Sequence, residues 1–420
     1  MKQLLVAVVG LAILGAACTS PATDDVGDRI VVGAVYPLSG SQGQGGIDEH
    51  HGVMLAADLV NAAGGIEGHD IALRSIDVAT ADAAPGAIEQ LDADGIDLVL
   101  GSYGSTISAP ASAAAAARGM LFWETGAVGM LPPASDRGGL TFRVPPTGEV
   151  LGAAAIRFVA SQVAPDRVRD PSALRYAVSF VDDVYGRTVA RGAIDAMRRR
   201  GLVDAGHFGY DPRTVDMRSL VRRIAAAGPD VLFVSAYLDD AIALRRELVR
   251  QDVPLVANIG TSSSYCMPAF GQTLGAQAVG VYASDKPSAA SIDPAGLRPE
   301  AAALLSRADA AFRSRWGVDM SPAALAGFSA AWGLFHDVLP HAASFAPADV
   351  AAAAGAVDLP MGSLPNGSGL RFGAPGTASA GNNLAAASVI WEWVRPGEAA
   401  VIWPPAFATD SVDPSTTDAW

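Results

Sequence analysis

Hydroxyl and glycine residues follow an apolar run in LVLGSYGST, at residues 98–106, and an alanine-rich segment comes next. That segment favours a helix, with Ser105 at its predicted N-cap and Thr106 in its first turn. The first N–H groups of a helix lack intrahelical partners, and the helix dipole adds partial positive charge there. Gly104 lets a ligand approach the backbone. The segment can therefore bind a carboxylate without Lys or Arg, although Ser105 could instead only cap its own helix.

Other chemistries fit this segment less well. A phosphate-binding loop would need a Lys after GSYGST, and the glycine-rich residues 37–46 also lack one and do not match the dinucleotide fingerprint. A serine hydrolase with Ser105 as nucleophile would need a Gly-x-Ser-x-Gly turn and a His base, and none of the 6 His residues follows a predicted cleft strand. Nor do these His residues show metal-ligand spacing. We therefore expect no catalysis, no cofactor and no metal; an exported serine hydrolase is the less favoured alternative.

Aromatic and acidic side chains fall directly after predicted strands. Glu124 ends one such strand, and Asp182 and Asp183 follow another; each could receive an ammonium or amide group of a ligand, or simply be solvated. Aromatic residues at this many strand ends indicate a lined cleft, although any single one could belong to the core, Trp123 above all. The aromatic residues are Tyr103, Trp123, Tyr185, Tyr237 and Tyr265.

The elements that must position these residues alternate between strand and helix. Short apolar strands and amphipathic or alanine-rich helices follow one another over residues 29–144, and the pattern resumes over 173–260. Continuously apolar strands in this alternation predict parallel sheets covered by helices on both faces. A helical segment follows at about 299–341, and two short strands at 388–407. The fold class is therefore α/β with two doubly wound lobes, and ligands bind such sheets outside the carboxyl ends of the strands.

Length and charge narrow the functional classes. A chain of 420 residues is too long for one ordinary core, so we expect two domains. Its 29 Lys and Arg against 43 Asp and Glu give a net charge of −14, and no basic stripe is present. This argues against nucleic acid or an anionic membrane surface as a partner.

The first residues, MKQLLVAVVGLAILGAAC, have the form of an export signal. The apolar stretch is shorter than the roughly 20 residues that span a bilayer. Small residues before Cys18 resemble the bacterial lipobox, although Gly15 stands where that pattern prefers Leu. We predict a signal peptide at 1–17, a lipidated Cys18 that begins a tether over 18–28, and a location on the extracytoplasmic face of the cell membrane, contacted only through the lipid. An ordinary cleaved signal is the alternative. Cys266 then has no disulfide partner and is expected to be a buried, inert thiol.

Four segments resemble the Leu/Ile/Val (branched-chain amino-acid) type of periplasmic substrate-binding proteins. They are VGAVYPLSGSQGQGGIDEHHGVMLAADLVNAAGGIEGHDIAL (32–73), LVLGSYGSTISAPAS (98–112), FVDDVYGRTVARG (180–192) and GNNLAAASVIWEWV (381–394). The resemblance implies the periplasmic binding protein type 1 fold, in which two lobes joined by three crossovers close on a ligand. It places lobe 1 at 29–147 plus 286–378 and lobe 2 at 148–285 plus 379–420. It also implies a monomer that delivers a small solute to an ABC transporter permease.

The resemblance assigns roles to several of these residues. Ser105 corresponds to a serine that receives the ligand carboxylate, and Gly126 and Ala127 correspond to a segment that supplies backbone contacts. Tyr185 and Tyr237 correspond to tyrosines of the second lobe. Together with Tyr103, Thr106, Glu124 and Ser262, these form the predicted ligand-binding set.

The sequence departs from the family at three positions. Val128 replaces a hydroxyl residue that helps to hold the ligand's ammonium group, Ser262 replaces a Glu of the second lobe, and Gly45 replaces an aromatic wall residue. An amide, a urea-like compound or a carboxylate is therefore as well matched as an amino acid. A ligand-sensing subunit of a membrane signalling system is the alternative function on the same fold.

Overall fold

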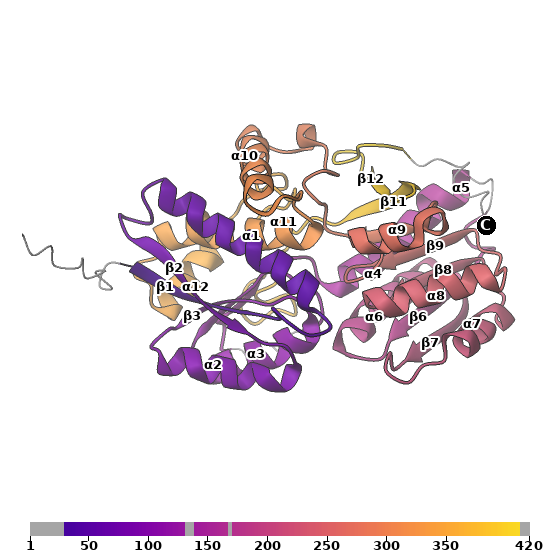
Figure 1. The fold of residues 1–420 in the computed structure, drawn as a ribbon, viewed down its shortest axis with the longest axis horizontal. Coiled ribbons are helices and arrows are strands. Elements are labelled where there is room, and N and C mark those ends of the chain that lie inside the picture. The colour runs from indigo at the N-terminus through magenta and orange to yellow at the C-terminus, as the bar shows by residue number, and fades with distance from the viewer. Residues whose placement is uncertain (1–28, 131–137, 167–169, 412–420) are drawn as a thin grey trace, which may run out of the picture.

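The computed structural model describes residues 29–130, 138–166 and 170–411. The predicted signal peptide, the tether and Cys18 lie outside these residues. Two lobes stand side by side, and the chain passes between them more than once (Figure 1). Within the described residues, no helix is both long and apolar enough to cross a membrane.

Lobe 1 is built on a parallel sheet in the order β2-β1-β3-β4-β5. Alternate residues of its inner strands face opposite layers. Val99 and Phe122 pack under α2 and α3, whereas Leu100 and Trp123 belong to the core that includes α1 and α11. Both faces are therefore covered, as the apolar strands predicted. The strands are β1 (Arg29–Tyr36), β2 (Asp70–Asp77), β3 (Leu98–Gly101), β4 (Leu121–Glu124) and β5 (Thr141–Arg143). The helices are α1 (Gly43–Ala62), α2 (Ala84–Ala93), α3 (Ser105–Ala117), α10 (Pro299–Trp316), α11 (Pro322–Trp332) and α12 (Pro347–Ala356).

Lobe 2 holds a sheet in the order β12-β11-β10-β9-β8-β6-β7. Its strands are parallel except for the hairpin β11–β12, which pairs antiparallel with β10. The sequence predicted the hairpin but not β7 or β10. The strands are β6 (Arg175–Val181), β7 (Val203–Tyr210), β8 (Val231–Ser235), β9 (Ala257–Thr261), β10 (Tyr282–Asp285), β11 (Val389–Arg395) and β12 (Glu398–Trp403). The helices are α4 (Gly148–Phe158), α5 (Ala164–Asp166), α6 (Val184–Arg200), α7 (Met217–Ala226), α8 (Leu238–Arg250) and α9 (Pro268–Leu274).

The chain crosses between the lobes after β5, after β10 and before β11. The predicted third boundary, at 378/379, comes too early. Asn382 bridges to Arg143 of β5, and Asn383 bridges to Phe372. The Asn383 amide also donates to the carbonyl oxygen of Val144, at 3.0 Å. These contacts keep the chain on lobe 1 as far as Asn383.

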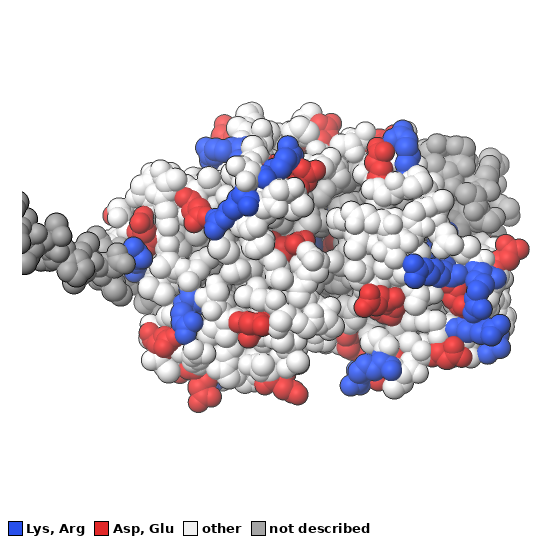
Figure 2. All heavy atoms as spheres, viewed as in Figure 1, with Lys and Arg blue, Asp and Glu red and all other residues white. Residues whose placement is uncertain are grey.

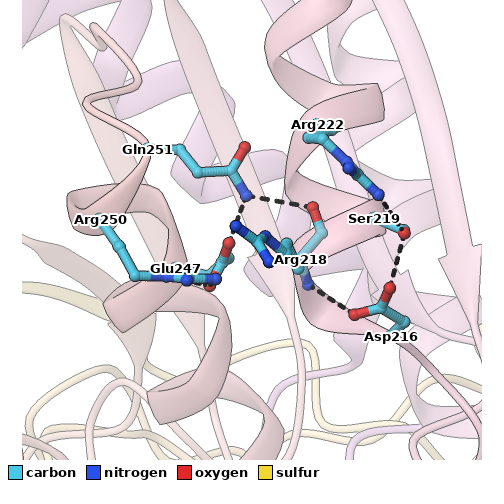
Figure 3. A network of polar contacts seen from close by, with 7 residues as sticks. All are labelled: Asp216, Arg218, Ser219, Arg222, Glu247, Arg250 and Gln251. Carbon is cyan, nitrogen blue, oxygen red and sulfur yellow. Dashed lines mark hydrogen bonds and ion pairs between the residues drawn. The ribbon is translucent and has the colours of Figure 1, made fainter.

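Polar contacts on the outer surface include helix caps and exposed side-chain hydrogen bonds. Figure 3 shows a network that joins the start of α7 to the end of α8. Asp216 caps α7 by accepting the N–H of Arg218 at 3.1 Å and the hydroxyl of Ser219 at 2.6 Å, and Gln251 of α8 donates to the Arg218 carbonyl at 3.1 Å. On the face drawn in Figure 2, basic side chains are scattered among acidic ones and form no continuous basic patch.

Candidate functional site

A cavity lies between the lobes, at the carboxyl ends of β3, β4, β9 and β10. Polar groups and apolar side chains share its wall. Lobe 1 supplies Asp48, Tyr103, Gly104, Ser105, Gly126, Ala127, Val128, Ser321, Pro322 and Ala323. Lobe 2 adds Tyr185, Tyr237, Ser262, Ser263, Cys266, Met267, Pro268 and Asp285, and Lys286 begins the crossover after β10.

Ser105 begins α3, as expected, but one position further into the helix than predicted. The N-cap is Gly104, with a φ of 86°, a conformation that glycine adopts without strain. The Ser105 hydroxyl oxygen accepts the N–H of Gly129 at 2.8 Å. Because this contact uses the oxygen as an acceptor, the hydroxyl hydrogen can still be donated to a ligand in the cavity.

Glu124 does not line the cavity, which corrects its predicted role. Its Oε1 accepts the N–H groups of Gly126 at 3.0 Å and Ala127 at 2.8 Å, and that of Ser102 at 3.1 Å. Its Oε2 accepts the hydroxyl of Ser108. The carboxylate is therefore fully occupied in holding the turn at 126–129 in place. The same contacts turn the N–H groups of Gly126 and Ala127 away from a ligand, so the backbone contact that remains to Gly126 is its carbonyl.

Lys286 is the main site residue that the sequence analysis missed. It follows β10, is only 4% exposed and lines the cavity. Its ammonium donates to the Gly126 carbonyl oxygen at 3.0 Å. A signal was available in the composition: Lys2 and Lys286 are the lysines of the sequence, and every other basic side chain apart from His is Arg. A single lysine in residues 29–420 is unusual enough to single out.

Two buried polar atoms on the wall have no hydrogen-bond partner among the described residues. They are Oδ1 of Asp285 and the hydroxyl oxygen of Ser262. The other oxygen of Asp285 accepts the Cys266 thiol at 2.7 Å. Burial raises the pKa of this thiol well above its usual value, so Cys266 is a buried, unreactive thiol, as predicted. Buried polar atoms without partners in a cavity wall are available to a ligand.

A second buried carboxyl lies behind the turn. The Thr125 hydroxyl donates to Glu49 Oε1 at 2.6 Å and also contacts the Tyr36 hydroxyl at 2.6 Å. A Cβ on Gly126 would stand 1.7 Å from Glu49 Oε2, so only glycine fits beside this carboxyl. Burial is the largest influence on Glu49 and raises its pKa to about 8, an effect that the charge of Lys286 partly opposes. Glu49 therefore holds its proton at neutral pH.

The second lobe contributes two tyrosines, as the resemblance implied. The Tyr185 hydroxyl donates to the carbonyl of Ser262, and that of Tyr237 donates to Asp183 at 2.7 Å. The two rings lie 5.5 Å apart between centroids. Both hydroxyls are thus held within lobe 2, and the rings form a fixed wall.

Several predicted residues lie elsewhere. Trp123 and Tyr265 are fully buried in the cores of their lobes. Thr106 is close to the cavity but does not line it: its hydroxyl oxygen accepts the Gln42 amide at 2.9 Å. Asp182 pairs at the surface with Arg187 at 2.6 Å, and Asp183 caps α6. Neither aspartate reaches the cavity, so neither can serve the ligand's ammonium group as predicted.

Tyr103 explains why position 45 holds Gly where the family has an aromatic residue. A Cβ at Gly45 would come within 2.2 Å of Cζ of Tyr103. The Tyr103 ring thus occupies the space that a larger residue 45 would fill. It also interacts with the Ser263 side chain of the second lobe. An aromatic wall is present here, supplied from the end of β3 instead of from the start of α1.

The lobes are closed on each other. Besides the Tyr103–Ser263 contact, the N–H of Met130 donates to the Thr188 hydroxyl at 3.0 Å. The side chains of Tyr237 and Thr106 also interact across the junction. No histidine lines the cavity, and among the described residues no group of His, Cys, Asp and Glu is arranged to hold a metal ion. The site can therefore enclose a small ligand, and Ser105 has no imidazole base beside it.

A model of the periplasmic binding protein family matches residues 29–389. The Leu/Ile/Val-binding protein homolog 8 of Brucella suis is 28% identical over 376 residues, 89% of this chain and 90% of that protein. These matches confirm the family resemblance given by the sequence motifs.

Solved structures share the fold at low identity. A leucine binding protein of Thermotoga maritima superposes with a TM-score of 0.73 at 14% identity, covering 89% of this chain and 97% of that one. A branched-chain amino acid transporter substrate binding protein of Streptococcus pneumoniae, solved with isoleucine, gives 0.70 at 18%, covering 90% and 100%. They confirm the predicted two-lobed α/β fold. With the family match over residues 29–389, they lead to one conclusion: this chain belongs to the periplasmic binding protein family.

Proposed function

We propose that the protein captures one small metabolite in the cavity between its lobes and delivers it to the permease of an ABC transporter. The observation that carries this proposal is the enclosed cavity itself, with Ser105 at the N-terminus of α3 facing a wall of tyrosines. Family membership supports the binding role, and the relatives named for Leu, Ile and Val binding support the transporter. Closure of two lobes by a hinge motion converts binding into a shape that a transporter can recognise.

The ligand belongs among small amino-acid-like, amide, urea-like or carboxylate compounds. Ser105 and the first N–H groups of α3 suit a carboxylate or carbonyl oxygen. Met267, Pro268 and Pro322 give the cavity an apolar part that suits a hydrocarbon body. The protein acts as a monomer and performs no chemistry on the ligand.

The location is the extracytoplasmic face of the cell membrane, through lipid on Cys18. This part of the proposal comes from the leader sequence alone. Mass spectrometry of the N-terminal peptide tests it, since a diacylglyceryl-modified cysteine at position 18 would support the anchor. An unmodified or differently cleaved N-terminus would contradict it.

The binding role is tested by thermal unfolding against a panel of amino acids, amides, ureas and carboxylates. A ligand at a hundred times its Kd stabilises a binder by about 2.7 kcal/mol, which shifts the Tm visibly. Ser105→Ala should weaken that ligand about tenfold or more, because one buried hydrogen bond is lost, and should lower the Tm of the free protein modestly, because the Gly129 N–H loses its acceptor. Ser219→Ala, in the surface network of Figure 3, is the matched control. A ligand recovered chemically changed would contradict capture, and equal affinity in Ser105→Ala would contradict this placement of the site.

A further inference from the structure

Lys286 lines the cavity as a buried base whose charge acts on the carboxyls of Asp285 and Glu49, although it forms no direct ion pair with either. It makes no ion pair shorter than 4.0 Å within the described residues, although it is only 4% exposed. Lysine is almost never buried this deeply unless it is paired, because an unpaired charge loses its hydration without compensation. Its one hydrogen bond, to the Gly126 carbonyl, is with a neutral group. A ligand that carries a negative group would complete this environment.

Donors to such a group lie at the two ends of the turn at 126–129, where Lys286 contacts Gly126 and Ser105 contacts Gly129. Glu124 consumes the N–H groups of Gly126 and Ala127, so the turn at 126–129 cannot supply them. The hydroxyl of Ser105 can donate from the other end of the same turn, where it is fixed by Gly129. The α3 N-terminus adds partial positive charge beside Ser105. Lys286 therefore supplies the full charge, and Ser105 and the α3 N-terminus supply additional hydrogen bonds.

The same arrangement disfavours an ammonium group at this place. The Gly126 carbonyl, an acceptor that a ligand ammonium could use, is occupied by Lys286. Val128 offers no hydroxyl, and Ser262 offers no carboxylate. A second ammonium beside Lys286 would meet a like charge in a site with little water to screen it.

Asp48 and Asp285 are the acids of the cavity wall that could reverse this conclusion. Both oxygens of Asp48 already accept hydrogen bonds, from Gln44 and Ser321, whereas Oδ1 of Asp285 has no partner among the described residues. Its other oxygen already accepts the Cys266 thiol. With the unpartnered hydroxyl of Ser262, Oδ1 is suited to a neutral donor on the ligand, such as a hydroxyl or amide. An experiment must therefore separate a ligand ammonium bound at Asp285 from a ligand carboxylate bound at Lys286.

We propose that the ligand is a carboxylate without an α-ammonium group, and that Lys286 is the residue that selects it by binding that carboxylate together with Ser105. This inference rests on the proposed function, because it takes the cavity as the solute site. The side-chain ammonium group of Lys286 takes the place of the α-ammonium group that an amino acid would carry.

Matched ligand pairs test the inference on the purified full-length chain by isothermal titration calorimetry. The pairs are leucine with 4-methylpentanoate and phenylalanine with 3-phenylpropanoate, with the neutral amides of both acids as further probes. We expect at least one des-amino carboxylate to bind at least about a hundredfold more tightly than its amino acid. Lys286→Met should weaken that carboxylate by about thirtyfold, the loss of a charged hydrogen bond, and should narrow the ratio between the paired ligands.

Two further variants keep the test decisive. Lys286→Gln retains an amide donor without the charge and serves if Lys286→Met fails to fold; it should weaken the carboxylate and leave the neutral amide unaffected. Asp285→Asn should leave the carboxylate bound. Tighter binding of an amino acid, lost in Asp285→Asn, would overturn the inference while leaving solute capture in place. An unchanged affinity ratio between the carboxylate and its paired amino acid in both Lys286 variants would also overturn the inference. Binding of the amides alone would overturn it as well. If neither these probes nor the broader panel bind, the inference and the proposed function both fail.

Discussion

The two sides of the cavity are built differently. On the lobe 1 side, Ser105 and the turn at 126–129 are held by buried charged groups, with Glu124 beneath the turn and Arg143 donating to the Gly129 carbonyl. On the lobe 2 side, rings, hydroxyls and the Asp285 carboxyl at the end of β10 face the cavity. Tyr185 and Tyr237 direct their hydroxyls into their own lobe. Buried polar contacts thus hold the lobe 1 turn in place, whereas the lobe 2 wall consists of rings, hydroxyls and the carboxyl at the end of β10.

This difference indicates how binding energy is divided. Groups that are fixed before the ligand arrives lose little entropy on binding, so the lobe 1 side is prepared for a polar group. The lobe 2 side acts by closing, since the contacts of Tyr103 with Ser263 and of Tyr237 with Thr106 form only when the lobes meet. Changes on the lobe 1 side should therefore affect stability and affinity strongly, and changes to the lobe 2 hydroxyls should mainly affect closure.

The largest expected effect comes from removing the carboxyl beneath the turn. Glu124→Ala deletes hydrogen bonds to three N–H groups and to Ser108, and it leaves the charge of Arg143 without the acid beside it. We expect a loss of about 3–5 kcal/mol in the free energy of unfolding, measured by urea denaturation. Glu398→Ala is the control, because its pair with Arg395 is exposed and should contribute less than about 1 kcal/mol. A loss of similar size in both variants would contradict the difference between the two sides.

The next largest effect is a pH dependence of the free energy of unfolding, which should follow the titration of the Glu49 carboxyl. Its pKa rises from 4.5 in the unfolded chain to about 8 in the folded one, so the folded state retains a proton that the unfolded state releases. Raising the pH above 4.5 therefore destabilises the fold, by about 1.4 kcal/mol per pH unit until the folded pKa is reached. Between pH 6.5 and 8 the free energy of unfolding should fall by about 2 kcal/mol.

Glu49→Gln supplies the comparison for that pH series. Glutamine keeps the size and an acceptor for Thr125 but has no proton to lose. Unfolding by urea at several pH values should give a nearly flat stability for this variant over the same window. A slope equal to that of the unchanged protein would assign the effect to other groups.

A smaller effect is expected where Tyr103 lies over Gly45. Gly45→Ala places a Cβ 2.2 Å from Cζ of the ring, so the ring must move. Overpacking of this kind costs about 1–3 kcal/mol, and Tyr103→Ala in the same chain should recover part of that cost. Thermal unfolding of the single and double variants measures both. Gly86→Ala in α2 is the control, because nothing lies within 4 Å of its added Cβ, and it should be neutral or stabilising. Full additivity of the two changes would contradict direct contact.

The smallest effect should come from the lobe 2 hydroxyl that holds Asp183. Tyr237→Phe removes one hydrogen bond of 2.7 Å and the side-chain interaction with Thr106 across the junction. We expect about 1 kcal/mol, seen as a severalfold loss of ligand affinity with little change in unfolding. Tyr176→Phe is the control, because that buried hydroxyl has no partner among the described residues. Equal losses of ligand affinity in Tyr237→Phe and Tyr176→Phe would show that the contact between Tyr237 and Thr106 does not contribute to binding.

The sequence predicted the architecture well because its strands are strongly apolar and its helices have clear ends. It missed β7, an edge strand with exposed residues and two glycines, which weaken any β pattern. It also missed β10, which has four residues and is defined by its neighbours β9 and β11. Missing β10 meant that Asp285 and Lys286 were not recognised at a strand end.

Part of the predicted ligand-binding set lines the cavity for a related reason, and its binding role stays a prediction. Ser105, Tyr185 and Tyr237 follow strands and line the cavity, as do Gly126 and Ala127. Glu124 also ends a strand, yet its carboxyl points at backbone N–H groups. Sequence position gives the end of a strand but not the direction of the side chain beyond it. That direction is set by which donors lie within reach, which only the folded chain determines.

The position of the first described residue has a mechanical consequence. β1 begins at Arg29, paired with Asp70, at the amino-terminal edge of the lobe 1 sheet, and the cavity lies at the opposite, carboxyl edge. Figure 1 shows this start at the far end of lobe 1 from lobe 2. A force applied through residues 1–28 would load β1 and its hydrogen bonds to β2 and β3, and would bypass the three crossings. The chain therefore enters the fold at the edge of lobe 1 that is opposite the cavity, away from all three crossings.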